Sequence, residues 1–196
     1  MKNSNPITAI ILAGGQSRRM GRDKGLVLLN GKPMVQHIID KAQTITKKVM
    51  IITNQPGYEH FGVPTYSDLI QDKGPLGGIY TGLHYAQTEY NLVLSCDIPL
   101  VPVSFLKRLV NYQDEYQAWV PVQGEQLQPL CAVYKKEIAD RMKLSIEDGQ
   151  LSMHKFLKTI NTAFIDVSDV EPEYKNWFAN LNTPEEVKEH ETNYDD

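Results

Sequence analysis

The chain has few cysteines. Only Cys96 and Cys131 occur among its 196 residues, and they are far apart without the spacing of metal ligands. Small secreted domains that depend on disulfides are much richer in cysteine, and zinc knuckles need closely spaced pairs. The sequence therefore disfavours a disulfide framework and a zinc knuckle, and it fits a reducing compartment.

Long apolar runs are also missing. A membrane-spanning helix needs about 20 apolar residues, and the first apolar run covers only residues 7–13. That run leads directly into a glycine-rich, charged motif instead of a cleavage region, which argues against a signal peptide. We therefore expect no membrane association and a cytoplasmic location.

The chain has no excess of positive charge either. Its 20 Lys and Arg residues are outnumbered by 24 Asp and Glu residues, which gives a net charge of −4. A mildly acidic chain without a basic run is a poor candidate for general nucleic-acid binding. A site for a single nucleotide is still compatible with this charge, because a phosphate site is a local feature.

What the chain does have is an ordinary globular composition, with 41% hydrophobic and 22% charged residues. A chain of this length buries a sizeable core without a disulfide or a metal to hold it together. It contains no internal repeat, low-complexity stretch or linker. We expect one domain over residues 1–196, with a polar, frayed tail at 191–196.

Strand and helix patterns alternate along the first half of the chain. Continuous apolar runs predict strands that are buried on both faces, over residues 7–12, 48–53 and 92–96. Helical periodicity predicts helices from Pro33 through Ile45, over 77–87 after the Gly74-Pro75 breaker, and over 103–111. This order predicts an α/β fold, with a mostly parallel central sheet and helices on both faces.

The second half has a different pattern. Two strands, 118–122 and 130–134, flank Gly124 and are expected to be joined by a turn or short loop. Helices are predicted near 136–143 and 151–157, and a late strand at 163–167. A last helix is predicted to begin at Pro184, with Thr183 as N-cap and Glu186 completing a capping box.

The most informative segment is the loop of residues 12–24, which follows the first strand. Gly14 and Gly15 allow the backbone to approach an anion closely, and Arg18, Arg19 and Lys24 add three positive charges within seven residues. These parts predict a polyphosphate site, although a surface loop with merely solvated basic residues is the alternative. The spacing matches neither the P-loop nor the G-x-G-x-x-G dinucleotide fingerprint.

Two acidic residues, Asp68 and Asp97, are candidates for the same binding edge of the predicted sheet as the glycine loop. Asp97 ends the third strand, where a divalent cation would reconcile its carboxylate with a triphosphate; the alternative is an Asp that only caps or turns the chain. Asp68 could accept from the two N–H groups of guanine or from a ribose hydroxyl, and the alternative is a solvated loop acid. Cys96 is interpreted as a small buried residue.

Together these residues resemble the molybdenum cofactor guanylyltransferases, a family of the Rossmann-like nucleotidyltransferase fold. The resemblance begins with the loop from Leu12-Ala13-Gly14-Gly15 to Asp23-Lys24 and spans nearly the whole chain. The other segments that match the family follow in the same order along the chain. They are Asn54, Gly74-Pro75-Leu76 with Gly78, Cys96-Asp97 with Pro99, Gln128-Pro129-Leu130, Asn180, and Asn182-Thr183-Pro184-Glu185.

The resemblance implies the substrates. The family transfers GMP from GTP to the phosphate of molybdopterin or Mo-molybdopterin and releases pyrophosphate. Further proteins of molybdenum cofactor biosynthesis, or acceptor enzymes, are implied as partners. A GTP-binding half over residues 1–112 and an acceptor-side half over 113–190 would share the domain.

The resemblance also implies roles for individual residues, with Arg19, Lys24 and Asp97 as the catalytic set. Asp97 would hold the cofactor Mg²⁺, and Asn180 and Asn182 would lie near the pterin. The GTP-binding set would be Leu12, Ala13, Gly14, Gly15, Arg19, Lys24, Asn54, Asp68, Gly78 and Asp97. The attacking phosphate is already ionised, so no general base is required.

Three other functions share parts of this pattern. A related nucleotidyltransferase that uses CTP or UTP with another phosphorylated acceptor would have the same loop, Lys24 and Asp97. A non-catalytic nucleotide-binding regulator would not need the metal carboxylate. An NAD-binding Rossmann domain is disfavoured by the missing fingerprint.

Overall fold

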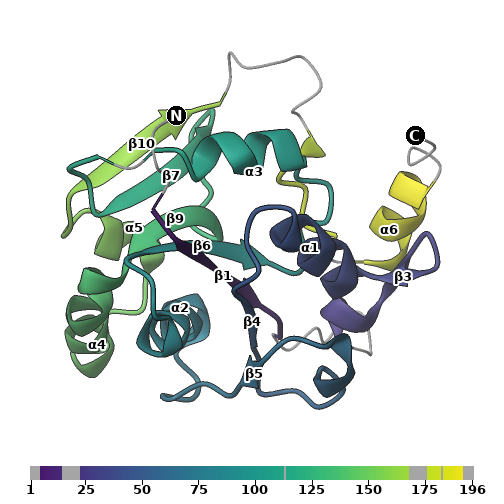
Figure 1. Cartoon of the computed structure of the whole chain (residues 1–196), viewed down its shortest axis with the longest axis horizontal. Coiled ribbons are helices and arrows are strands. Elements are labelled where there is room, and N and C mark those ends of the chain that lie inside the picture. The colour runs from purple at the N-terminus through teal and green to yellow at the C-terminus, as the bar shows by residue number, and fades with distance from the viewer. Residues whose placement is uncertain (1–4, 15–22, 113, 168–175, 182, 192–196) are drawn as a thin grey trace.

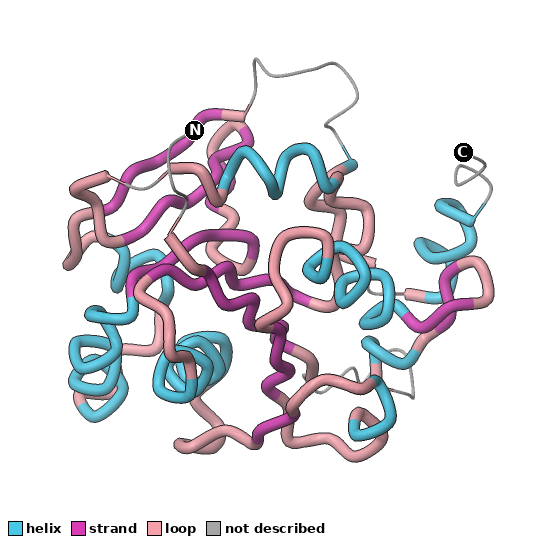
Figure 2. The backbone as a smooth tube through the Cα atoms, in the orientation of Figure 1, coloured by secondary structure: helices cyan, strands magenta, loops and turns pink. Residues whose placement is uncertain are grey.

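The computed structural model describes residues 5–14, 23–112, 114–167, 176–181 and 183–191. Its centre is an eight-stranded sheet that runs through the molecule, with helices on either side (Figures 1 and 2). Among the described residues, no helix is both long and apolar enough to cross a membrane.

The sheet follows the order β10-β7-β9-β6-β1-β4-β5, and β8 pairs with β7. The pairs β1–β4, β1–β6, β4–β5 and β7–β10 are parallel, whereas β9 is antiparallel to both of its neighbours. The prediction of a mostly parallel central sheet is therefore confirmed. The strands are β1 (Ile7–Leu12), β4 (Val49–Ile52), β5 (Thr65–Tyr66), β6 (Tyr90–Ser95), β7 (Ala118–Gln123), β8 (Gln126–Leu127), β9 (Cys131–Lys135) and β10 (Thr162–Asp166).

The helices cover both faces, also as predicted. Alternate residues of β1 explain this arrangement, because Ile11 packs into one apolar core and Ile10 into the other. The first core receives α1 (Met34–Gln43) and α3 (Val103–Leu109), and the second receives α2 (Gly74–Tyr85), α4 (Ala139–Glu147) and α5 (Met153–Leu157). Figure 1 shows α1 and α3 on the side of the sheet opposite α2 and α4.

A smaller unit packs beside the sheet. The hairpin of β2 (Leu28–Leu29) and β3 (Lys32–Pro33) contacts α6 (Pro184–Glu191), and Leu29, Leu181 and Val187 share a third apolar cluster. The predicted capping box at the start of α6 is present. The Thr183 N–H donates to Glu186 Oε2 over 3.0 Å, and the Glu186 N–H donates to Thr183 Oγ1 over 3.2 Å.

Several predicted boundaries were wrong. The helix predicted from residue 77 begins at Gly74, because Pro75 lies in the first turn, where its missing N–H costs no hydrogen bond. The helix predicted near 136 begins as a 3-10 turn, Lys136–Ile138, and α4 follows it. The turn at Gly124, whose φ is +60°, joins β7 to β8 rather than to β9. The frayed tail was expected over residues 191–196, but Glu191 is the last residue of α6; residues 192–196 lie outside the described residues.

Candidate active site

Three parallel strands end side by side at one edge of the sheet. Leu12, the last residue of β1, pairs with Ile52 of β4 and with Ser95 of β6. The chain runs from β1 outward through β4 to β5, and β6 then lies on the other side of β1. This reversal places a topological switch point between β1 and β6, where open α/β sheets bind their ligands. The residues that follow β1 and β6 therefore meet at the expected binding edge.

The first loop begins with a backbone conformation that suits glycine. Gly14 has a φ of +130°, and a Cβ at this position would lie 3.3 Å from Thr53 Oγ1. The neighbouring Ala13 N–H is already used, since it donates to the Ile52 carbonyl over 2.9 Å. Gly15, Arg18 and Arg19 belong to residues 15–22, which lie outside the described residues, so their roles in phosphate binding stay predictions.

The structure brings Lys24 and Asp97 together from opposite sides of the switch point. Lys24 begins a 3-10 turn, η1 (Lys24–Leu26), and its Nζ lies 4.0 Å from Asp97 Oδ2. The two side chains are 27% and 20% exposed, so both can be reached from solvent. At this distance the lysine can bind phosphate oxygens, and the carboxylate can bind a metal ion that the same phosphates also coordinate.

Asp97 is held in place by its own strand. The Ser95 hydroxyl donates to Asp97 Oδ1 over 2.5 Å, and the Asp97 carbonyl accepts from the Leu181 N–H over 2.9 Å. Ser95 was not assigned a role from the sequence. The signal that could have found it is its spacing of two residues from Asp97, because a short polar side chain can hydrogen-bond a neighbour two positions away where a strand ends in a turn.

A second pair of predicted residues lies where the chain leaves β4. Asn54 Nδ2 donates to Asp68 Oδ2 over 2.8 Å, and the Asp68 N–H donates to Asn54 Oδ1 over 2.9 Å. The other oxygen, Asp68 Oδ1, is buried and accepts no hydrogen bond from the described residues. Burial raises the pKa of Asp68, and the hydrogen bond from Asn54 opposes this shift.

The free oxygen of Asp68 faces an apolar wall. A Cβ built on Gly78 would lie 3.8 Å from Asp68 Oδ1 and 3.2 Å from a methyl carbon of Leu12. Leu12, Asp68 and Gly78 are therefore neighbours, and their joint role in binding GTP stays a prediction. A buried carboxylate oxygen without a partner is suited to a ligand that donates N–H or O–H groups.

Cys96 is structural, as predicted. It is buried, and burial raises the pKa of its thiol to about 12, against a hydrogen bond from the Gly14 backbone. A thiol with such a pKa carries almost no thiolate at neutral pH, so it is a poor nucleophile.

On the acceptor side, only part of the prediction can be placed. Asn180 lies next to Leu181, whose N–H contacts the Asp97 carbonyl, so it is close in the chain to the site. Asn182 lies outside the described residues. Among the residues that the structure describes, no cluster of three or more acidic, cysteine or histidine side chains forms a ready metal cage. A single carboxylate fits Mg²⁺, which keeps most of its coordination for phosphate oxygens and water.

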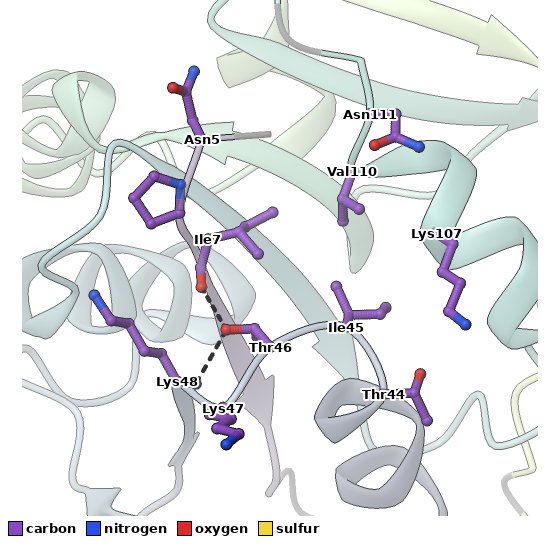
Figure 3. A pocket seen from close by; sticks show the side chains of 11 residues that line it. Asn5, Ile7, Thr44, Ile45, Thr46, Lys47, Lys48, Lys107, Val110 and Asn111 are labelled. Carbon is purple, nitrogen blue, oxygen red and sulfur yellow. Dashed lines mark hydrogen bonds between the residues drawn. The ribbon is translucent and has the colours of Figure 1, made fainter. Parts of the chain in front are cut away.

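A separate pocket of about 550 Å³ lies at the opposite edge of the sheet, around the starts of β1 and β4. Three lysines, Lys47, Lys48 and Lys107, line it, but they extend in different directions and do not converge on one point (Figure 3). Thr46 closes its wall by donating to the Ile7 carbonyl over 2.8 Å. This pocket is remote from the predicted site residues, and we assign it no role in the reaction.

The fold agrees with comparisons against known proteins. Residues 9–163 match the model of the MobA-like NTP transferase domain. The chain is 36% identical over 183 residues to a molybdenum cofactor guanylyltransferase of Vibrio campbellii, covering 91% of each chain. It is 37% identical over 191 residues to one of Shewanella sediminis, covering 93% of this chain and 94% of the relative.

Solved structures show the same fold. Molybdopterin-guanine dinucleotide biosynthesis protein A from Archaeoglobus fulgidus superposes with a TM-score of 0.81 at 23% identity, covering 94% of this chain and 97% of that one. A 2-C-methyl-D-erythritol 4-phosphate cytidylyltransferase from Thermus thermophilus gives a TM-score of 0.71 at 12% identity, covering 95% and 98%. The family match covers most of the chain, and the predicted family is confirmed: this chain belongs to the MobA-like NTP transferases.

Proposed function

We propose that the protein is a molybdenum cofactor guanylyltransferase, which transfers GMP from GTP to the phosphate of molybdopterin or Mo-molybdopterin. The observation that carries this proposal is the meeting of Lys24 and Asp97 at the switch point between β1 and β6. The similarity to guanylyltransferases over more than nine-tenths of the chain supports the choice of reaction.

The reaction is an in-line displacement at the α-phosphorus of GTP. An oxygen of the pterin phosphate forms a new bond to this phosphorus, the bond to the bridging oxygen of the β-phosphate breaks, and pyrophosphate leaves with the electron pair. The attacking phosphate is an anion at neutral pH, so no side chain has to remove a proton. What the protein must supply is positioning and compensation of charge.

The residues divide this work. Lys24 offers a positive charge to the phosphates of GTP, together with Arg19 from the loop. Asp97 would hold Mg²⁺ with the triphosphate, and the bound ion would supply further neutralisation of phosphate charge. Ser95 and the Leu181 N–H fix the segment that carries Asp97.

Guanine is the base that best suits the space beside Asp68. Guanine presents two adjacent N–H groups, N1–H and the exocyclic amine, and Asp68 Oδ1 is a buried acceptor without a partner among the described residues. Cytosine and adenine carry an acceptor nitrogen at the corresponding ring position. Two acceptors, this nitrogen and the carboxylate oxygen, would then face each other and repel. Gly78 carries no side chain, and Leu12 and Asp68 Oδ1 lie next to it.

We also assign the substrates to halves of the domain, with GTP on residues 1–112 and the pterin on 113–190, near Asn180 and Asn182. Further proteins of molybdenum cofactor synthesis, or the enzymes that receive the product, are the protein partners that this function implies.

The test is to incubate the purified protein with Mg²⁺, molybdopterin and each nucleoside triphosphate in turn, and to measure pyrophosphate. We expect pyrophosphate with GTP, and a dinucleotide product that contains guanine. Release with CTP or UTP in preference to GTP would instead identify a related nucleotidyltransferase. No release with any of them, despite tight binding of GTP, would identify a non-catalytic binder.

A further inference from the structure

The backbone around Lys24 is fixed by hydrogen bonds, first between its two neighbours and then to a residue far away in the chain. Its two neighbours, Asp23 and Gly25, are joined by a hydrogen bond, because the Gly25 N–H donates to Asp23 Oδ1 over 2.9 Å. Asp23 is thereby the N-cap of η1, the turn that Lys24 begins. The backbone position of Lys24 therefore depends on where the Asp23 carboxylate is held.

That carboxylate is held by Tyr58, from the segment that follows β4. The phenol donates to Asp23 Oδ1 over 2.5 Å, although the two residues are 35 positions apart in the chain. The second oxygen, Asp23 Oδ2, is buried and accepts no hydrogen bond from the described residues. The phenol and the Gly25 N–H are thus the donors that fix this carboxylate within the part of the chain that the structure describes.

Tyr58 has no freedom to move away. Its side chain is completely buried, and burial raises the pKa of the phenol well above its ordinary value, so the group keeps its proton to donate. On the other side, a Cβ at Gly25 would lie only 2.3 Å from Tyr58 Oη and 3.3 Å from Cys96 Sγ. Gly25 and Tyr58 therefore fit against each other, and a side chain at position 25 would displace the phenol.

We propose that Tyr58 is a positioning residue for nucleotide binding: its buried phenol holds the Asp23 carboxylate, and Asp23 in turn sets η1 so that Lys24 faces the phosphates beside Asp97. This inference rests on the proposed binding of GTP at this edge. It extends that function to a residue that touches no substrate and lies outside the glycine loop.

The test compares GTP and guanosine affinities in a double-mutant cycle of Tyr58→Phe and Lys24→Ala, using the whole chain with Mg²⁺. We expect Tyr58→Phe to weaken GTP binding by a factor on the order of ten, because residues in one hydrogen-bond network are energetically coupled. Guanosine has no phosphate, so its affinity should stay at the wild-type value. In the Lys24→Ala background, Tyr58→Phe should have little further effect on GTP.

A matched control removes a buried hydroxyl far from the site. Thr8 and Thr88 share a buried hydrogen bond of 2.6 Å at the other end of β1, and Thr8→Val deletes it. This variant should bind GTP like the wild type even where its thermal stability falls. If Tyr58→Phe does not fold, Asp23→Ala removes the acceptor of the same contact and enters the same cycle.

A second arm uses the close fit at Gly25. Gly25→Ala should weaken GTP binding, and Tyr58→Phe should restore part of the loss in the double variant, because it removes the oxygen that the new methyl group meets.

The outcomes separate this inference from the proposed function. Normal GTP binding by the wild type with an unchanged Tyr58→Phe variant would overturn the positioning role alone. Equal losses for GTP and guanosine, or the same loss with and without Lys24, would reduce Tyr58 to a structural residue and also overturn it. Absence of GTP binding by the wild type would overturn the proposed function and this inference together.

Discussion

Asp97 is the single residue on which the proposed chemistry depends most. Asp97→Asn keeps the shape and the hydrogen bond from Ser95, but it removes the charge that would hold Mg²⁺. We expect pyrophosphate release to fall by about 10²–10³, because lost stabilisation of transition-state charge costs this much. Thermal unfolding of the variant should stay close to that of the wild type.

The matched control for this variant is Asp140→Asn, at an exposed position on α4. It makes the same chemical change away from the site and should leave turnover unaltered. Near-normal turnover by Asp97→Asn at saturating Mg²⁺ would contradict the metal assignment.

The carboxylate of Asp68 is expected to lower the stability of the folded protein at neutral pH while it contributes to the selection of guanine. Its pKa is raised in the folded protein, so ionisation of the carboxylate costs stability once the pH exceeds the ordinary value of 3.8. Asp68→Asn should therefore raise the melting temperature at pH 7, and the gain should shrink as the pH falls to 4, where the carboxyl is increasingly protonated in both states. The measurement is thermal unfolding without nucleotide at the two pH values.

The same substitution should reduce selection of guanine. The amide oxygen would keep the contact with Asn54, which places the new NH₂ group where Oδ1 faces the space beside Gly78. There a donor meets the N–H groups of guanine, so the preference for GTP over ATP should fall by about tenfold. A variant that selects GTP as well as the wild type does would show that Asp68 does not read the base.

The segment after β6 depends on a half-buried lysine of α1. Lys41 Nζ donates to the carbonyls of Pro99 and Val101, the latter over 2.8 Å, which ties the chain beyond Asp97 to the helix. Burial lowers the pKa of Lys41 from 10.5 to about 8. Between these values the unfolded chain binds more protons than the folded one, so the free energy of unfolding should rise with pH.

The effect of Lys41 can be measured by urea unfolding at pH 7.5 and pH 9.5. From pH 7.5 to pH 9.5, the free energy of unfolding should rise more in the wild type than in Lys41→Met. The difference should grow by at most about 1.4 kcal/mol per pH unit. The comparison with the variant cancels the titration of other groups. Parallel pH dependences of the two proteins would show that Lys41 does not titrate in this window.

The elements that could be predicted are those with a pattern of their own. The apolar runs of β1, β4 and β6 and the capping box of α6 are encoded in neighbouring residues, and all four were found. The two-residue strand β5 is too short to show any period, and the antiparallel direction of β9 depends on its partners rather than on its sequence. The observed start of α2 lies before the predicted one because Pro75 is tolerated in a first turn.

The site divides in the same way. Lys24, Asp68 and Asp97 stand in motifs or after strands, so the sequence could point to them. Tyr58 and Lys41 act across 35 and about 60 positions of the chain, respectively. Such long-range contacts leave no local spacing to recognise, and they become visible only when the fold brings β4, α1 and β6 together.

One continuous sheet joins the two proposed halves, since β6 of the first half pairs with β9 of the second. This connection can be tested because both tryptophans, Trp119 and Trp177, belong to residues 113–190 and pack against the same core. Fluorescence therefore reports two acceptor-half side chains at their contacts with Tyr90 and Phe105 of the first half, whereas far-UV circular dichroism reports the whole chain. If the halves unfold together, the two signals should give one midpoint.

GTP with Mg²⁺ should shift both signals equally, although its proposed contacts lie within residues 1–112. At about 100 times its dissociation constant, a ligand adds about 2.7 kcal/mol, which corresponds to a rise of roughly 5–10 °C for a chain of this size. CTP at the same concentration should produce a smaller shift, and Lys24→Ala should lose most of the shift with GTP. A tryptophan transition that stays in place while the dichroism transition moves would show that the halves unfold independently. In that case the acceptor half would need its own ligand to be stabilised.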